Sequence, residues 1–302
     1  MAVNLAKRLT AQGRELSEVG SLRESTSLVG NPEALRQRMA EDGYIFLRGF
    51  LNREDAQAAR RDILQRVAAE GALDPDADLM DGVLATTERV GFDPSRTRGS
   101  AAIQRLLFQG PMMAFFAEFL GDEVRGFDYV WLRSVSPGFG TKPHGDSVFM
   151  NRGTRNLYTA WTPLGEIDLE LGGLIVLEGS HRLDEVRQSY GERDVDTFCE
   201  GDNAGEVYQL PEGQPWHGQI DDDPVALQTR LGGRWLTATF EPGDLLVFGM
   251  GTLHASLDNS TANRLRLSTD TRYQLASESV DERWVGEEPI GHGPEAKRGI
   301  IC

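Results

Sequence analysis

Three residues that lie far apart in the chain have the types and spacing needed for metal chemistry. His144-Gly145-Asp146 places an imidazole and a carboxylate two positions apart, so in an extended segment both side chains project from one face. His254 comes much later, after an apolar run and the glycine-rich turn 249–251. Two histidines and one carboxylate on one octahedral face, with three positions open, are typical of non-haem Fe(II) oxygenases. Taken alone, a His-x-Asp tripeptide fits a surface turn equally well.

Two arginines follow His254 and have a role that fits this chemistry. Arg264 and Arg266 lie at the start of the strand that is predicted after His254, at 265–274. If 2-oxoglutarate is the cosubstrate, its 1-carboxylate and keto oxygen chelate iron, and its far carboxylate needs a guanidinium that forms two parallel hydrogen bonds. Because the two arginines are two residues apart, they share one face of a strand, and strand direction does not choose between them. More often, an arginine in a strand is exposed to solvent and forms an ion pair, without binding a ligand.

The elements that must position these residues change in character near residue 126. Before it, the pattern is mostly helical: Asn31-Pro32-Glu33 predicts a helix that ends at Gly43, and Asn52 caps a second helix that ends at Gly71. A short strand is expected at 44–47 and a further helix at 100–120. Residues 72–98 have no clear period and predict a long loop.

The second part of the chain has the alternation and turn signals of β-structure. Strands are predicted at 127–135, 157–162, 174–177, 234–240, 244–248, 253–257 and 265–274. This pattern favours a mainly β fold, an antiparallel barrel or jelly roll with flanking N-terminal helices. Residues 184–232 are acidic and glycine-rich and predict an insertion between strands.

Composition excludes several classes of function. The 302 residues contain 31 Lys+Arg against 47 Asp+Glu, a formal net charge of −16, which argues against nucleic acid or an anionic membrane as partner. Two cysteines are too few for a disulfide framework or a cysteine-based metal site. No apolar run approaches a membrane span, and residues 1–15 lack the apolar core of a signal peptide. We therefore expect a cytoplasmic protein.

A series of motifs in a fixed order resembles the phytanoyl-CoA dioxygenase family of Fe(II)/2-oxoglutarate-dependent oxygenases. The resemblance spans roughly residues 42–274. It consists of Asp-Gly-Tyr-Ile-Phe-Leu-Arg-Gly-Phe at 42–50, His-Gly-Asp at 144–146, Ala-Trp-Thr-Pro-Leu at 160–164, Gly-Leu-Ile-Val-Leu-Glu-Gly-Ser-His at 173–181, Gly-Asp at 243–244, His-Ala-Ser at 254–256, Asn259 and Arg-Leu-Ser at 266–268.

The resemblance implies a fold and a set of site residues. The fold is one domain over 1–302, a double-stranded β-helix (cupin-like jelly roll). It has a helical part at about 1–125, a core at about 126–275 and a tail at 276–302. His144, Asp146 and His254 would bind Fe(II), and Trp161 would pack against 2-oxoglutarate. The family's strand places the distal arginine at Arg266 in preference to Arg264. Further candidates for the cosubstrate are listed here: Thr141 and Arg133.

The predicted function is that of an enzyme that uses Fe(II), 2-oxoglutarate and O₂. It would hydroxylate, or otherwise oxidise, an unactivated C–H bond of a small metabolite or natural-product intermediate, with release of succinate and CO₂. Related halogenases lack the carboxylate at the position of Asp146, so its presence favours oxygen transfer. The alternative is a jelly-roll protein that binds a metal or ligand without turnover. We expect a monomer or homodimer, a structural turn at His181, and no catalytic role for His292 in the charged tail.

Overall fold

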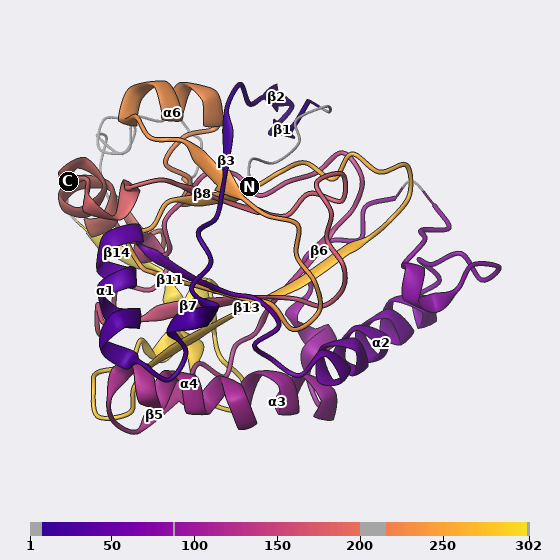
Figure 1. Ribbon diagram of the computed structural model, residues 1–302, viewed down its shortest axis with the longest axis horizontal. Helices are drawn as coiled ribbons and strands as arrows, with labels where there is room; N and C mark the ends of the chain where they lie inside the picture. Colours follow the sequence, from indigo (N-terminus) through magenta and orange to yellow (C-terminus); the bar gives the residue numbers. More distant parts are fainter. Residues whose placement is uncertain (1–7, 87, 200–215, 301–302) are drawn as a thin grey trace.

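The chain folds into two facing β-sheets with helices packed mainly on the outer side of the larger one. The structure is a computed structural model and describes residues 8–86, 88–199 and 216–300. Figure 1 shows helices α2, α3 and α4 along one side of the strands and α6 at the opposite end. The helices are α1 (Pro32–Asp42), α2 (Arg53–Ala69), α3 (Ala101–Phe108), α4 (Gly110–Leu120) and α6 (Pro224–Leu231).

The larger sheet has six strands, which pair in the order β4-β11-β7-β13-β5, with β6 also paired to β13. The strands are β4 (Tyr44–Leu47), β11 (Leu245–Gly249), β7 (Tyr158–Pro163), β13 (Arg266–Leu275), β5 (Val124–Gly126) and β6 (Trp131–Val135). Alternate residues face opposite sides. Ile45, Leu47 and Val247 pack with the helices, whereas Phe46 and Phe248 face the second sheet.

The smaller sheet has the order β12-β8-β10-β3. Its strands are β12 (His254–Ser256), β8 (Leu174–Leu177), β10 (Trp235–Thr237) and β3 (Val19–Ser21). Side chains from both sheets share one buried cluster, in which Val176 and Leu236 meet Phe46 and Trp161. The space between the sheets is therefore a packed core, and this is the jelly-roll arrangement that the sequence predicts.

Most predicted elements are present, and the differences lie in short pieces. All seven predicted strands of the second part have counterparts in β6, β7, β8, β10, β11, β12 and β13. The helix expected at 100–120 is two helices, because Gln109 takes an extended backbone (φ −139°, ψ 169°) between α3 and α4. The N-terminal part also supplies strands: β3 pairs in parallel with β10, and β4 lies at the edge of the six-stranded sheet.

The predicted insertion and tail contain ordered elements that their composition did not suggest. Within 184–232, the described residues form β9 (Thr197–Cys199), α6 and short helical turns. β9 pairs in parallel with β14 (Arg298–Ile300) of the tail. Residues 200–215 of the predicted insertion lie outside the described residues.

Candidate active site

Backbone pairing at the β12 edge of the smaller sheet brings His144 and His254 together. His254 opens β12, and the segment before Asp146 lies alongside it. His144 and His254 each donate a backbone N–H to the other's carbonyl oxygen, with both N···O distances 2.9 Å. In such a closely paired antiparallel bridge the side chains lie next to each other. The imidazole centroids are accordingly 4.2 Å apart.

Asp146 reaches the histidines through a single extended residue and not through a regular strand. Gly145 is extended (φ −116°, ψ 148°), and Asp146 begins a short 3₁₀ turn, Asp146–Val148. The Tyr190 hydroxyl accepts the Gly145 N–H at 2.9 Å and donates to the Gly218 carbonyl at 2.6 Å. The segment 144–146 is therefore not a regular strand, but one extended residue is enough to direct both side chains to the same place, as expected for an extended segment.

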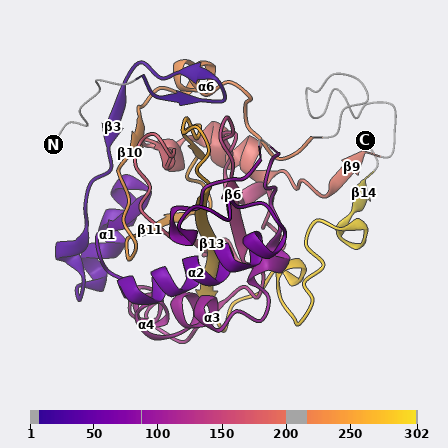
Figure 2. The ribbon, with the colours of Figure 1, turned by 90° about the vertical axis from the view of Figure 1, so that its right-hand side faces the viewer.

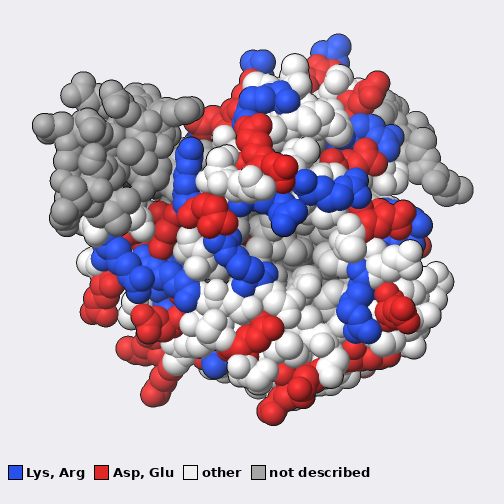
Figure 3. Space-filling view, turned by 90° about the vertical axis from the view of Figure 1, so that its left-hand side faces the viewer, with Lys and Arg blue, Asp and Glu red and all other residues white. Residues whose placement is uncertain are grey.

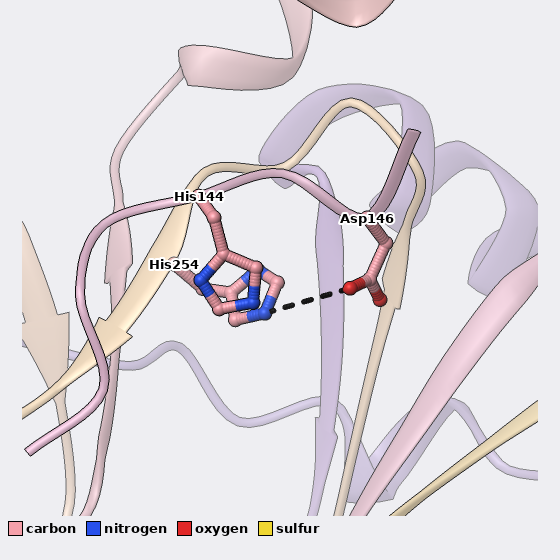
Figure 4. A group of neighbouring side chains, drawn as sticks. All are labelled: His144, Asp146 and His254. Atoms are coloured by element: carbon pink, nitrogen blue, oxygen red, sulfur yellow. Dashed lines mark ion pairs between the residues drawn. The ribbon is translucent and has the colours of Figure 1, made fainter. Parts of the chain in front are cut away.

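The three side chains form a ligand set for a divalent metal ion (Figure 4). One ligand atom from each lies within 4.8 Å of the other two, and His254 Nε2 is 3.9 Å from Asp146 Oδ1. Nδ1 of His144 is 2.7 Å from the Lys142 carbonyl, and Nδ1 of His254 is 3.1 Å from the Thr252 carbonyl. Each carbonyl holds an Nδ1–H tautomer, which leaves both Nε2 atoms free for a metal.

The electrostatic environment holds these groups in the protonation state that binds metal. Burial lowers the pKa of the His144 imidazole to about 3, with a further contribution from His254. Burial also lowers the pKa of His254. At Asp146 burial opposes ionisation, but the Arg272 guanidinium and the two histidines outweigh it, so the pKa of this carboxyl lies well below its usual range. Neutral imidazoles and an ionised carboxylate are the donors that iron(II) requires.

Arg272 and Thr159 hold the Asp146 carboxylate, and neither was a candidate from sequence. Arg272 Nη2 donates to both Asp146 oxygens at 3.0 Å, and the Thr159 hydroxyl donates to Oδ2. The guanidinium lies over the Trp131 ring, 4.0 Å from its centroid. Strand parity would have found Arg272, because residues at even spacing from Arg266 share the inward face of β13.

A cavity of about 400 Å³ opens onto His144 and Asp146 of the triad. Its walls are largely aromatic and apolar, with cationic groups among them. The lining residues are Phe92, Trp131, Arg133, Thr141, Lys142, His144, Asp146, Phe149, Met150, His217, Gln219, Arg272 and His292. A mostly apolar cavity with a few converging polar groups is typical of a small-molecule site.

Two predicted cosubstrate residues, Thr141 and Arg133, line this cavity. Thr141 donates its backbone N–H to the Ser256 hydroxyl at 2.8 Å, which fixes it beside β12. Arg133 Nε donates to Asp270 Oδ2 at 2.7 Å. The cavity therefore receives a guanidinium whose charge is already balanced by a carboxylate on β13.

The structure separates the two candidate distal arginines. Arg266 is buried on the inward face of β13, where Nη1 donates to the Gly172 carbonyl and Nε has no partner among the described residues. The buried Ser268 hydroxyl, on the same face, also lacks one. These unpaired donors fit an anionic group such as a carboxylate. The Arg264 side chain is 41% exposed and lies 3.8 Å from the Asp168 carboxylate.

Trp161 and His181 lie outside the cavity. Trp161 is buried between the sheets, in edge contact with Phe240 (centroids 4.6 Å apart). It neighbours Asp270 across the pairing of β7 with β13. His181 Nε2 is 3.1 Å from the Ala40 carbonyl, at the turn after β8. Among the described residues, the grouped metal donors are His144, Asp146 and His254, so His181 is not one of them.

A family model described as phytanoyl-CoA dioxygenase (PhyH) matches residues 39–267. The chain belongs to this family. It is 28% identical over 263 residues to the 1-deoxypentalenic acid 11-beta-hydroxylase of Streptomyces exfoliatus, and the alignment covers 84% of this chain and 85% of that protein. The hydroxylase of the same name from Streptomyces arenae is 27% identical over 266 residues, again covering 84% and 85%.

Solved structures share the fold at lower identity. The epimerase SnoN in complex with Fe³⁺, alpha ketoglutarate and nogalamycin RO has a TM-score of 0.55 at 20% identity, covering 86% of this chain and 93% of that one. EctD from S. alaskensis with 2-oxoglutarate and 5-hydroxyectoine has a TM-score of 0.56 at 18% identity, covering 100% and 98%.

The family and the donor set together define the class of this family member. It is an Fe(II)- and 2-oxoglutarate-dependent oxygenase that uses O₂. The family acts on small molecules. In the part of the chain that the structure describes, no helix is long and apolar enough to cross a membrane.

Proposed function

We propose that this enzyme hydroxylates an unactivated C–H bond of a small, mainly apolar natural-product intermediate. The observation that carries the proposal is the buried triad, of which His144 and Asp146 line a cavity walled by aromatic side chains. Support for a hydroxylase comes from the relatives that act on 1-deoxypentalenic acid. The retained Asp146 carboxylate supports oxygen transfer, because it occupies the place that related halogenases leave for halide.

The residues divide the work between metal, cosubstrate and substrate. His144, Asp146 and His254 would hold iron(II), with Arg272 fixing the carboxylate. When bound, the metal and 2-oxoglutarate would supply the oxidising power: one atom of O₂ would enter succinate, formed with CO₂, and the other the new hydroxyl of the product. The buried, unpaired donors of Arg266 and Ser268 would hold the distal carboxylate of the cosubstrate.

Trp161, Thr141 and Arg133 have supporting roles in this proposal. Trp161 would shape the inner end of the cosubstrate site from β7, and Thr141 and Arg133 would contact the cosubstrate or substrate from the cavity wall. Arg264, exposed beside Asp168, takes no part. Excluding water from the buried metal side strengthens every polar contact made there.

The proposal also covers how the chain is organised. The N-terminal strand β4 and helix α2 share one core with strands of the second part, which supports a single catalytic domain with the helical part, core and tail given above. We propose a cytoplasmic monomer or homodimer. On the face in Figure 3 acidic and basic side chains are interspersed, which supports a small molecule and not a polyanion as the partner.

Anaerobic loading followed by oxygen tests the function. Protein with Fe(II) and 2-oxoglutarate should develop the weak visible metal-to-ligand charge-transfer band, and O₂ should then give succinate. The substrate screen starts with 1-deoxypentalenic acid and related apolar acids, with product oxygen traced by ¹⁸O₂. Iron-loaded, folded protein that shows no band and no succinate would favour a jelly-roll binding protein without turnover.

A further inference from the structure

The C-terminal segment, beyond the family match that ends at residue 267, contributes His292 to the wall of the cavity. It crosses the molecule after β13 and ends in β14, which pairs in parallel with β9. Figure 2 shows β9 and β14 side by side at the edge of the molecule, next to the chain terminus. Arg298 donates its backbone N–H to the Asp196 carbonyl at 2.8 Å. The segment is thus attached by main-chain bonds to the region between β8 and β10.

Asp196 is the centre of an ionic cluster that fastens the segment. The residue is fully buried, and its carboxylate accepts hydrogen bonds from three side chains of the C-terminal segment. The donor distances are 2.7 Å from Arg283 Nη1, 2.8 Å from Lys297 Nζ and 2.7 Å from His292 Nδ1. Arg283 also donates to Asp281 and Asp194, so His292 Nδ1 joins a network of several carboxylates and cations.

His292 therefore lies in the cavity wall, and its Nδ1 is hydrogen-bonded to Asp196. Its ring lies 4.6 Å from the Trp284 ring and 5.5 Å from the Phe149 ring, centroid to centroid. Trp284 is fully buried and packs on Trp131, so it limits the movement of the His292 ring. With Nδ1–H donated to Asp196, the remaining polar atom is Nε2, which has no hydrogen-bond partner among the described residues and carries a lone pair.

We infer that His292 is a specificity-determining residue that accepts a hydrogen bond, through Nε2, from a hydroxyl group of the substrate, with Asp196 as the residue that positions it. The inference deepens the proposed function and rests on it. The cationic groups of the cavity, Arg133, Lys142 and Arg272, are each paired with a carboxylate, so the free Nε2 of His292 adds a different selectivity. An acceptor fixed in an apolar wall favours a compound that has a donor at that place over its deoxy analogue.

The test uses adamantane-1-carboxylic acid and its monohydroxylated isomers as probes of a compact apolar acid with and without a hydroxyl. Wild type, His292→Phe and His292→Gln, each loaded with Fe(II) and 2-oxoglutarate, are titrated by the shift of the charge-transfer band. At least one hydroxylated isomer should bind wild type about five- to tenfold more tightly than it binds His292→Phe. The parent acid should bind both alike, and His292→Gln should retain part of the preference.

A separate measurement, the tautomer of His292, tests whether Asp196 positions the imidazole. In the Zn(II) form with ¹⁵N-labelled histidine, His292 should show a protonated Nδ1 and an unprotonated Nε2, and Asp196→Asn should alter this tautomer while leaving His181 unchanged. The inference is wrong if wild type prefers no hydroxylated isomer, if His292→Phe keeps the preference, or if the His292 tautomer ignores Asp196→Asn. A wild type that forms no charge-transfer band before any probe is added would instead count against the proposed function.

Discussion

The metal side and the tail side of the cavity are held by different forces. On the metal side, His144 and His254 are fixed by reciprocal backbone hydrogen bonds between buried segments, and Asp146 by a buried arginine. On the tail side, His292 is fixed by a carboxylate whose other partners include Lys297, 45% exposed at its side chain. The three metal donors lie inside the family match, which ends at residue 267, whereas Arg272 on the metal side and His292 and Lys297 on the tail side lie beyond it. The metal donors thus belong to the region that the family shares, whereas the residue that we infer to govern selectivity does not.

Removing a metal ligand should have the largest effect. His254→Ala deletes one of three donors, and we expect loss of the charge-transfer band and a fall in succinate formation of about 10³-fold or more. Iron content by mass spectrometry and band intensity measure it. His181→Ala is the matched control, since His181 lies outside the ligand set. Normal iron binding in His254→Ala would contradict the triad.

The next effect separates the two arginines near the start of β13. Arg266→Ala should weaken 2-oxoglutarate binding by about 30- to 100-fold, because a buried charge-assisted pair with the distal carboxylate is lost. Arg264→Ala, at an exposed site, should change it less than twofold. Titration of 2-oxoglutarate into the anaerobic Fe(II) protein gives both values. Equal effects of the two variants would remove Arg266 from the cosubstrate site.

Arg272 should matter through the carboxylate that it holds. Arg272→Gln removes the contact to Asp146 and should lower Fe(II) affinity by about 10- to 100-fold, as other outer-sphere substitutions do. Fe(II) competition against a chelator measures the affinity, and the energy of the charge-transfer band reports on the ligand field. Arg272→Lys should recover part of the affinity. A variant that folds with unchanged affinity and band would reduce Arg272 to a packing role.

Acid should destabilise the metal-free protein because the buried His144 imidazole resists protonation in the folded state. The pKa of His144 is depressed to about 3 in the folded state from 6.5. Below pH 6.5 the unfolded chain takes up a proton that the folded chain excludes, so stability is full above that pH and falls as pH drops toward 3. The melting temperature should decrease between pH 7.5 and 5. His144→Asn should flatten this dependence, and an unchanged slope would argue against neutral burial of His144.

The smallest effect is expected at Lys297, a partly exposed member of the ionic cluster around Asp196. Lys297→Ala removes one of three side-chain donors to Asp196, at a partly exposed site, and should reduce the free energy of unfolding by about 1 kcal/mol or less. Urea unfolding measures the change. High salt should diminish the difference between variant and wild type. A loss of several kcal/mol would mean that the tail is fastened as rigidly as the metal centre.

The sequence alone determined the class of chemistry and the strand order along the chain. His144, Asp146 and His254 are recognisable because metal binding demands particular donor types, and apolar alternation marks the strands that carry them. Helix caps at Asn31 and Asn52 are local signals, and both cap hydrogen bonds are present in the structure. Such features depend on neighbours within a few residues and are therefore visible before folding.

Tertiary structure decided which polar residues meet. The burial of Arg266 and the exposure of Arg264 depend on strands that pair from distant parts of the chain, because both residues have the same type and parity. The contact of Arg272 with Asp146 and the place of His292 beside the cavity likewise require segments more than a hundred residues apart to converge. Sequence spacing does not show which distant residues come into contact. The contact of Arg272 with Asp146 and the position of His292 in the cavity wall were therefore found only in the folded structure.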